Sequence, residues 1–160
     1  DKMDYFAIDN PKSLPRLLYR IAKLQTNSIN RILKKMNITM DQLTLLAEPY
    51  RQDGMSLKVL AAKTCKDHTN IARILKPFVA EGLVEIMSPP EDRRYKLVYL
   101  TKAGREYMSE LERYMGKCSE FAYNHYDKST LDLMMRSMQM YEAIIVNNCY
   151  EIEQFAIKME

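Results

Sequence analysis

The sequence of 160 residues has little of what enzymes use for chemistry. It holds two histidines and four glycines, and it shows no glycine-rich phosphate loop, no cysteine/histidine cluster and no motif that pairs two carboxylates. These absences argue against an enzyme. They also lead us to expect no cofactor and no metal centre.

Cysteines and long hydrophobic runs are scarce as well. Cys65, Cys118 and Cys149 are odd in number and widely spaced, and no apolar stretch near the N-terminus resembles a signal peptide. The nearest to a membrane-spanning run, residues 143–146, is far shorter than the roughly 20 residues that a spanning helix needs. We therefore predict a protein of the reducing cytoplasm that has no membrane partner.

Charge is present but unevenly distributed. The net charge of +3 is too small to indicate a nucleic-acid partner by itself. Residues 56–105, however, carry ten Lys/Arg against five Asp/Glu, whereas residues 106–160 carry five against ten. The middle third is therefore the candidate surface for a polyanion, although the same excess also suits an ordinary solvated surface.

Helical periodicity dominates the first fifty residues. Apolar side chains recur at helical spacing from Leu14 to Met36, which predicts a first long helix. A second helix is expected to begin near Thr39. It should bend or end at Pro49, because proline removes a backbone hydrogen bond inside a helix.

The next fifty residues predict two short helices and a hairpin. Ser56 and Asp67 are N-cap candidates for the two helices, and Gly82 suits the left-handed residue that follows the second of them. Residues 83–87 and 95–100 are rich in β-branched and aromatic side chains, and the seven residues between them include two prolines and two arginines. They predict an antiparallel hairpin with a basic tip.

Two long helices are expected after the hairpin. From Thr101 onward, and again after residues 127–129, apolar positions step alternately by four and three residues, as in a heptad repeat. Seams of this length exceed what a small helix-turn-helix needs for its own core. They predict packing against each other and against a second copy of the chain, and hence a homodimer formed through the termini.

The fold class that follows is mainly α with one small β-hairpin. Helix, turn, helix and basic-tipped hairpin, in this order, are typical of a winged helix-turn-helix, which we place at residues 39–105. The helices of residues 13–36 and 106–159 are assigned to dimerisation, and residues 1–160 are treated as a single unit. The predicted partner is double-stranded DNA.

The second helix of the motif has side chains of the kinds that read a major groove. Its apolar positions leave one polar and cationic face, formed by His68, Thr69, Asn70, Arg73 and Lys76. Asparagine suits a bidentate contact to adenine and arginine one to guanine, whereas Lys76 suits a phosphate. Ser56 and Lys58, at the start of the preceding helix, are further candidates for phosphate contact.

The tip of the hairpin has its own candidates. An arginine on a loop stiffened by Pro89 and Pro90 can reach the minor groove beside a docked helix. Arg93 or Arg94 is assigned this role. Asp92 is expected to orient a neighbouring arginine through a charge-assisted hydrogen bond.

Several stretches together resemble one known family. They are Ser56-Leu57-Lys58-Val59-Leu60-Ala61, Thr69-Asn70-Ile71-Ala72-Arg73, Gly82-Leu83-Val84, Glu91-Asp92-Arg93-Arg94 and Leu100-Thr101-Lys102-Ala103-Gly104-Arg105. Over residues 56–105 the chain is similar to the multiple-antibiotic-resistance regulators, the MarR family of bacteria and archaea. The resemblance implies a dimer formed by the outer helices, a pseudo-palindromic operator, and repression that a small phenolic ligand, a metal or an oxidant relieves.

The resemblance also implies roles for single residues. Thr69, Asn70 and Arg73 would face bases or phosphates, and Asp92 with Arg93 would form the wing contact. The family's effector pocket would lie between the first helix, the second helix and the start of the helix after the wing. In this sequence that places it near Tyr19, Leu46 and Tyr107.

Two residues depart from the family pattern. Ala72 stands where the family often has a hydroxyl residue, and Pro77 interrupts the predicted recognition helix. Because proline lacks a backbone N–H, Pro77 is expected to kink the C-terminal half of that helix.

Two alternatives keep the fold but change the function. A winged helix that binds protein has no need of a cationic face, so Arg73 and Arg93 argue against it. A redox- or metal-sensing regulator would use Cys65, in the helix-turn-helix connection, or Cys118 with His125, which are seven residues apart on one face of the predicted helix. Packing of Cys118 in the core is the plainer interpretation.

Overall fold

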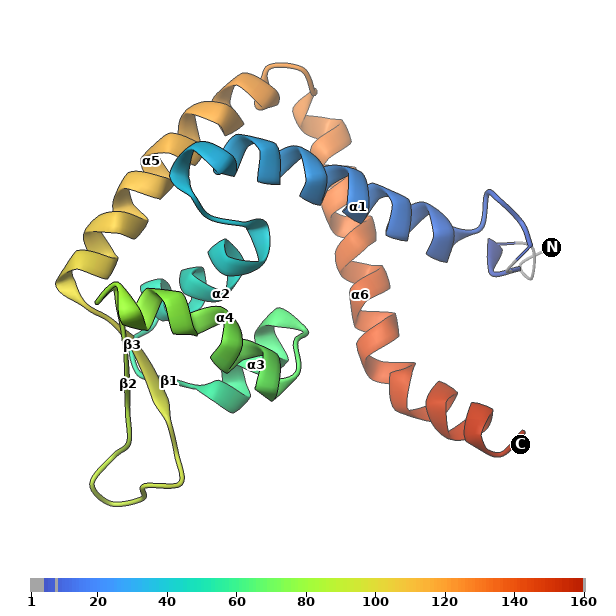
Figure 1. Ribbon diagram of the computed structural model, residues 1–160. Helices are drawn as coiled ribbons and strands as arrows, with labels where there is room; N and C mark the ends of the chain where they lie inside the picture. Colours follow the sequence, from blue (N-terminus) through green and yellow to red (C-terminus); the bar gives the residue numbers. More distant parts are fainter. Residues whose placement is uncertain (1–4, 8, 160) are drawn as a thin grey trace. The chain divides into compact units, whose positions relative to one another are not determined.

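The computed structural model describes residues 5–7 and 9–159 and forms two compact units, Asp1–Glu112 and Arg113–Glu160. In chain order the elements are α1 (Leu14–Leu33), the 3-10 helix η2 (Lys34–Met36), α2 (Met40–Arg51), β1 (Met55–Ser56), α3 (Leu57–Thr64), α4 (His68–Ala80), β2 (Val84–Met87), β3 (Leu97–Leu100), α5 (Lys102–Tyr123) and α6 (Lys128–Ile157) (Figure 1). The mainly helical fold with a small antiparallel sheet confirms the predicted class. The assignment of the outer helices to dimerisation stays a prediction.

α2 begins where the sequence predicts but ends later. Thr39 caps it through a capping box, in which the Gln42 N–H donates to the Thr39 hydroxyl (3.3 Å) and the Thr39 N–H donates to the Gln42 side chain (2.9 Å). Pro49 does not end the helix, which continues to Arg51. The proline ring is fully buried, and this burial offsets the hydrogen bond that the ring removes.

The connection between α3 and α4 is tight, as predicted. The Ser56 hydroxyl accepts the Val59 N–H (3.2 Å) and so caps α3. Cys65 ends α3 in the left-handed region at φ 51°, and Asp67 then caps α4. Gly82 follows α4 at φ 71°, a value that glycine adopts without steric cost.

A three-stranded antiparallel sheet in the order β1-β3-β2 forms the base of the hairpin. The hairpin pairs Val84 with Leu100, inside the predicted strands. β1, which pairs Met55 with Val98, is a strand that the sequence does not predict. It has only two residues, too few to show the alternation by which a strand is recognised in a sequence.

The core of the first unit forms where α2, α3, α4 and the sheet meet. Its fully buried aliphatic side chains are Leu33, Leu45, Leu46, Leu60, Ile71, Leu75, Val84, Val98 and Leu111. Burying one side chain of this size stabilises the fold by about 1.5–3 kcal/mol. Because Ile71 and Leu75 both belong to α4, the core holds one side of that helix inward and leaves the opposite side to solvent.

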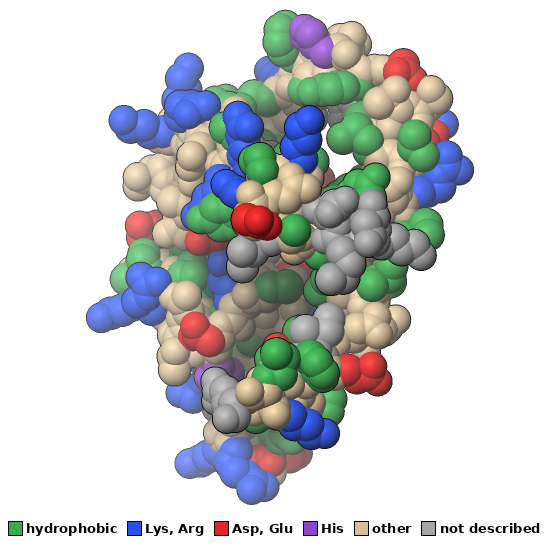
Figure 2. Space-filling view, turned by 90° about the vertical axis from the view of Figure 1, so that its right-hand side faces the viewer, with side chains coloured by type: hydrophobic (Ala, Val, Ile, Leu, Met, Phe, Trp, Pro, Cys, Tyr) green, Lys and Arg blue, Asp and Glu red, His purple; other side chains and the backbone are tan. Residues whose placement is uncertain are grey.

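The second unit buries little of its apolar surface. On α6 the large hydrophobic side chains that are exposed are Leu133, Met134, Met135, Met138, Met140, Ile144, Ile145, Val146, Tyr150, Phe155 and Ile157. Figure 2 shows hydrophobic side chains lying at the surface among charged ones. No helix in the described part of the chain has the length and apolarity to cross a membrane.

The hairpin is fastened to α5 by a small set of backbone contacts. The Thr101 N–H donates to the Leu83 carbonyl (3.1 Å), and the Thr101 hydroxyl donates to the Gly82 carbonyl (2.7 Å). The Gly104 N–H in turn donates to the Thr101 hydroxyl (3.0 Å), which caps α5. A Cβ on Gly104 would stand 2.0 Å from the Leu83 carbonyl oxygen, so a side chain there would push the hairpin away from α5.

We expect Gly104→Ala to lower the free energy of unfolding by about 2 kcal/mol or more, because the clash is with backbone that cannot turn aside. Urea denaturation measures the change. Gly116→Ala is the matched control: it lies in the same helix with nothing within 4 Å of its Cβ, and we expect it to stabilise by about 0.5–1 kcal/mol. Equal stability of Gly104→Ala and the unmodified chain would contradict a close contact between the hairpin and α5 at Gly104.

Candidate nucleic-acid interface

α4 presents the polar face that the sequence predicts. Ile71, Leu75 and Phe78 are buried on one side of the helix. The predicted contact residues on the other side are exposed or half-buried: His68, Thr69, Asn70, Arg73 and Lys76. The helix continues past Pro77 to Ala80, so the proline does not shorten this face.

The first turn of α4 is organised around one carboxylate. Asp67 Oδ1 accepts the Asn70 N–H (2.7 Å) and the Thr69 hydroxyl (2.7 Å). The hydrogen bond from Thr69, followed by that from the Asn70 backbone, holds the pKa of Asp67 below its usual range. The carboxylate therefore stays ionised at neutral pH and occupies the helix N-terminus itself, where an anion is stabilised by the free N–H groups.

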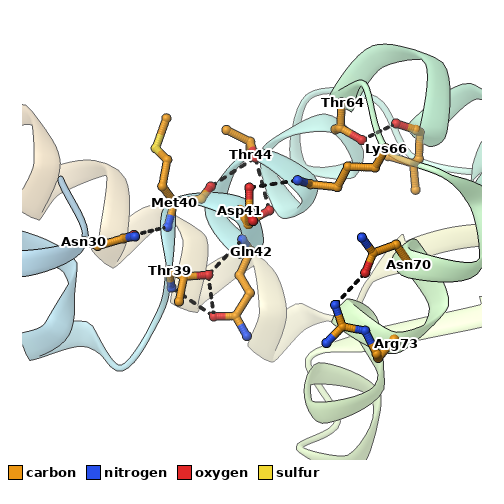
Figure 3. A network of polar contacts seen from close by, with 11 residues as sticks. Asn30, Thr39, Met40, Asp41, Gln42, Thr44, Thr64, Lys66, Asn70 and Arg73 are labelled. Carbon is orange, nitrogen blue, oxygen red and sulfur yellow. Dashed lines mark hydrogen bonds and ion pairs between the residues drawn. The ribbon is translucent and has the colours of Figure 1, made fainter. Parts of the chain in front are cut away.

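Asn70 and Arg73 are joined side chain to side chain. Arg73 Nη2 donates to Asn70 Oδ1 over 2.5 Å, and the two side chains point toward each other in Figure 3. They border a hollow of about 290 Å³ whose lining also includes Thr39, Asp41 and Gln42 from the start of α2. The start of α2 is thus a polar edge beside the exposed face of α4. The apolar periodicity that predicts α2 does not indicate this polar edge.

The wing pairs Asp92 with one of its two arginines. Arg94 Nε and Nη2 donate to the Asp92 carboxylate over 3.2 and 3.3 Å, and the Arg94 N–H donates to it over 3.0 Å. These bonds hold the pKa of Asp92 below its usual range. The predicted orienting role is confirmed in geometry, but the oriented arginine is Arg94. Within the described residues Arg93 has neither ion pair nor hydrogen bond, and its side chain is exposed.

Ion pairs reduce the free positive charge of the middle third. Lys66 Nζ lies 2.7 Å from Asp41 Oδ1, and Lys63 Nζ lies 3.1 Å from Glu48 Oε2. Both carboxylates belong to α2, and the Lys66 side chain is only 15% exposed. These two lysines fasten α2 to α3 and to the connection after it, so counting charges along the sequence overstates the basic surface.

The start of α3 holds the remaining two predicted contact residues. Ser56 is half-buried and its hydroxyl oxygen already caps α3, whereas Lys58 is exposed in the first turn. Lys58 is therefore the more available of the two for a phosphate.

Residues 38–96 match the model of the MarR family. The matched stretch runs from just before α2, through α3, α4 and β2, to the end of the wing loop. Over this stretch the chain is similar to the MarR family. Members of this family are transcriptional regulators and not enzymes, which sets the enzyme hypothesis aside.

Individual relatives agree with this assignment. The organic hydroperoxide resistance transcriptional regulator of Bacillus subtilis (strain 168) is 27% identical over 104 residues, which cover 65% of this chain and 69% of that protein. The MepR–DNA complex of S. aureus has a TM-score of 0.72 at 16% identity and covers 82% of this chain and 97% of MepR. CouR from Rhodococcus jostii RHA1, bound to p-coumaroyl-CoA, has a TM-score of 0.69 at 19% identity, covering 83% and 94%. These structures share the fold.

The three residues near which the MarR resemblance puts an effector pocket lie in different surroundings. Tyr19 is 68% exposed and borders a hollow at the start of α1, whereas Leu46 is fully buried in the core. Tyr107 borders a different hollow, of about 470 Å³, formed by the end of α1, η2, the start of α2, the end of α4 and α5. Burial raises the pKa of Tyr107, and two nearby glutamates add to the shift.

The three cysteines, all within the described residues, are not gathered into a site. In the described part of the chain, no three His, Cys, Asp or Glu side chains lie close enough together to hold a metal ion. The prediction that Cys118 and His125 share a helix face is wrong, because α5 ends at Tyr123 and His125 lies in the turn beyond, with its ring against Phe121. Cys65 is exposed and Cys118 is half-buried.

Asp67→Ala tests the carboxylate that organises α4. Since the folded-state pKa is lowered, the carboxylate stabilises the fold above its ordinary pKa near 4, and this stabilisation is lost as the pH falls through the lowered folded value. We expect the variant to melt below the unmodified chain at pH 7 and the gap to shrink below about pH 4. Asp67→Asn, which keeps a capping oxygen without the charge, is the control. A gap independent of pH from 7 to 3 would show that the charge plays no part.

Proposed function

We propose that this chain is a sequence-specific regulator that binds a pseudo-palindromic operator as a homodimer and represses transcription until a small effector releases it. The observation that carries the proposal is the pairing of charges around α4 and the wing. Asp67 and Asp92 are each held by hydrogen bonds within their own segment, while Arg73, Lys76 and Arg93 stay exposed. Both carboxylates are thus occupied by hydrogen bonds within their own segments, where the basic side chains are left for phosphates and bases.

The proposed contact is that of a winged helix-turn-helix. α4 enters the major groove with its exposed face, and Lys58 and Lys76 neutralise phosphates beside it. The wing lies along the flanking minor groove, where Arg93 enters and Arg94 is held in place by Asp92. In a two-fold dimer the two α4 helices would meet successive major grooves about 10 base pairs apart.

A salt titration with a random duplex tests DNA binding and separates it from the alternative of a protein-binding winged helix. We expect log K to fall with log salt by about 0.9 for each phosphate contact. Removing Arg93 and Arg94 together by alanine substitution should lower the affinity and flatten this slope, with the dimer unchanged. Lys117→Ala, an exposed lysine of α5 outside the winged helix, is the control. Affinity that does not depend on salt would favour the protein-binding module.

The dimer is supported by apolar surface that the single chain leaves exposed. On α6, Ile144 and Ile145 are 54% and 42% exposed, and on α1, Leu17, Ile21 and Leu24 are 47–58% exposed. Large apolar side chains that gather at the surface of one helix mark a protein contact. The apolar positions of α6 recur at heptad-like spacing, which suits packing against another helix. A second copy of the chain would supply that helix.

Ile144→Glu with Ile145→Glu tests the seam. A change of ~1.4 kcal/mol in binding free energy corresponds to a tenfold change in a dissociation constant. Burying two unpaired carboxylates at a helix contact costs far more than this, so we expect the dimer dissociation constant to rise at least about tenfold. Sedimentation equilibrium measures it. Gln139→Glu adds a charge on the same helix, among its exposed polar side chains, and is the control. A dimer that survives both isoleucine substitutions would place the interface elsewhere.

The hollow of about 470 Å³ is the proposed effector site. Its lining includes Tyr107 and Lys34 together with Pro77 and Phe78, which belong to α4. A ligand there would therefore contact α4, the helix that is proposed to bind DNA. It need favour the non-binding arrangement by only a few kcal/mol to release the operator. The cytoplasmic setting proposed from the scattered cysteines is compatible with such a regulator.

A redox- or metal-responsive form of the same regulator has less support. Cys65 is exposed, but in the described residues it belongs to no group of three or more His, Cys, Asp or Glu side chains that could hold a metal ion. The effector site above is favoured because its lining reaches α4 directly.

A further inference from the structure

Several hydrogen-bonding groups on the exposed face of α4 already have partners within the chain. The Thr69 hydroxyl hydrogen points to Asp67, and the Asn70 backbone N–H is bound by the same carboxylate. Asp67 thus occupies the first turn and leaves the Asn70 side chain to another partner. That partner is Arg73, one turn further along the helix (Figure 3).

The bond between Asn70 and Arg73 changes what asparagine can offer to a base. An asparagine side chain has one acceptor, Oδ1, and one donor group, the Nδ2 amide. Here Oδ1 accepts from the charged Arg73 Nη2 at 2.5 Å, a short charge-assisted bond. A base amino group approaching this oxygen would face the positive N–H groups of the guanidinium. The second lone pair of Oδ1 lies next to the same positive charge and is disfavoured for a base amino group, so the groove meets chiefly the Nδ2 amide, which only donates.

Arginine also offers donors only, since its guanidinium has five N–H groups and no acceptor. Asn70 and Arg73 together therefore present a surface made entirely of donors. In the major groove the guanine edge carries two acceptors, N7 and O6, whereas adenine carries the N7 acceptor beside the N6 amino donor. A donor-only surface fits guanine and opposes the amino group of adenine.

We infer that Asn70 and Arg73 act as one donor-only reading unit that selects guanine in the operator half-site, and that Asn70 does not read adenine. The inference rests on the proposed function, because it names the base that the proposed DNA contact prefers. It also revises the expectation, drawn from residue types alone, that the asparagine reads adenine and the arginine guanine independently.

Selection of bound duplexes from a random pool tests the unit, with the unmodified chain and three variants. The unmodified chain should select a guanine at one position of each half-site, with an adenine substitution there weakening binding roughly 5- to 150-fold. In Arg73→Ala the Asn70 oxygen is released, so the same position should change from guanine to adenine. Asn70→Ala should keep guanine with a weaker preference. Lys76→Ala, the matched cation of the same face, should weaken binding to every sequence without changing the base.

A second measurement probes the acceptors directly. Replacing the selected guanine by 7-deazaguanine removes the N7 acceptor and leaves O6, and we expect at least about fivefold weaker binding by the unmodified chain but little change for Arg73→Ala. Circular dichroism of each variant checks that α4 is intact.

Three results would overturn the inference. One is a selected adenine that disappears in Asn70→Ala and persists in Arg73→Ala, and another is a guanine preference that Arg73→Ala leaves intact. The third is specific binding that is insensitive to the 7-deaza substitution. Failure of the proposed function is a different observation, namely that no duplex is bound with salt-dependent affinity, and it would overturn both.

Discussion

Everything on the DNA-facing side depends on how α4 is packed. Ile71, Leu75 and Phe78 are buried against α2, α3 and the sheet, and a helix held by one stripe cannot rotate without exposing that stripe to water. The orientation of Asn70 and Arg73 is therefore set by residues that never meet a ligand. Substitutions in the core should disturb DNA binding as well as stability, whereas substitutions on the exposed face should leave the fold intact.

Around this packing, acidic groups serve to place basic ones. Asp67 caps α4, Asp92 fixes Arg94, and Asp41 holds Lys66 at the connection between α3 and α4. None of these carboxylates needs to touch DNA to affect binding. The same logic explains why a net charge as small as +3 is compatible with a polyanion partner: local pairing decides which charges remain available.

Features set by neighbouring residues were predictable from the sequence. The caps at Ser56 and Asp67 and the turn at Gly82 each depend on residues within one helical turn, and each is found. Features that depend on distant segments were not. β1 exists because β3 pairs with it, α2 runs past Pro49 because the ring is buried, and the choice of Arg94 over Arg93 follows from the course of the wing loop. The grouping of Tyr19, Leu46 and Tyr107 stays a prediction, since a family pattern indicates neither that Leu46 is buried nor that Tyr19 and Tyr107 border different hollows.

The central claim is that α4 and the wing contact one duplex together. Hydroxyl-radical footprinting on a duplex selected from the source genome tests it most directly. The account predicts two protected backbone regions related by two-fold symmetry about 10 base pairs apart, each with flanking minor-groove protection that Arg93→Ala removes while the inner protection stays. A footprint without such symmetry, or flanking protection that survives the loss of Arg93, would contradict it.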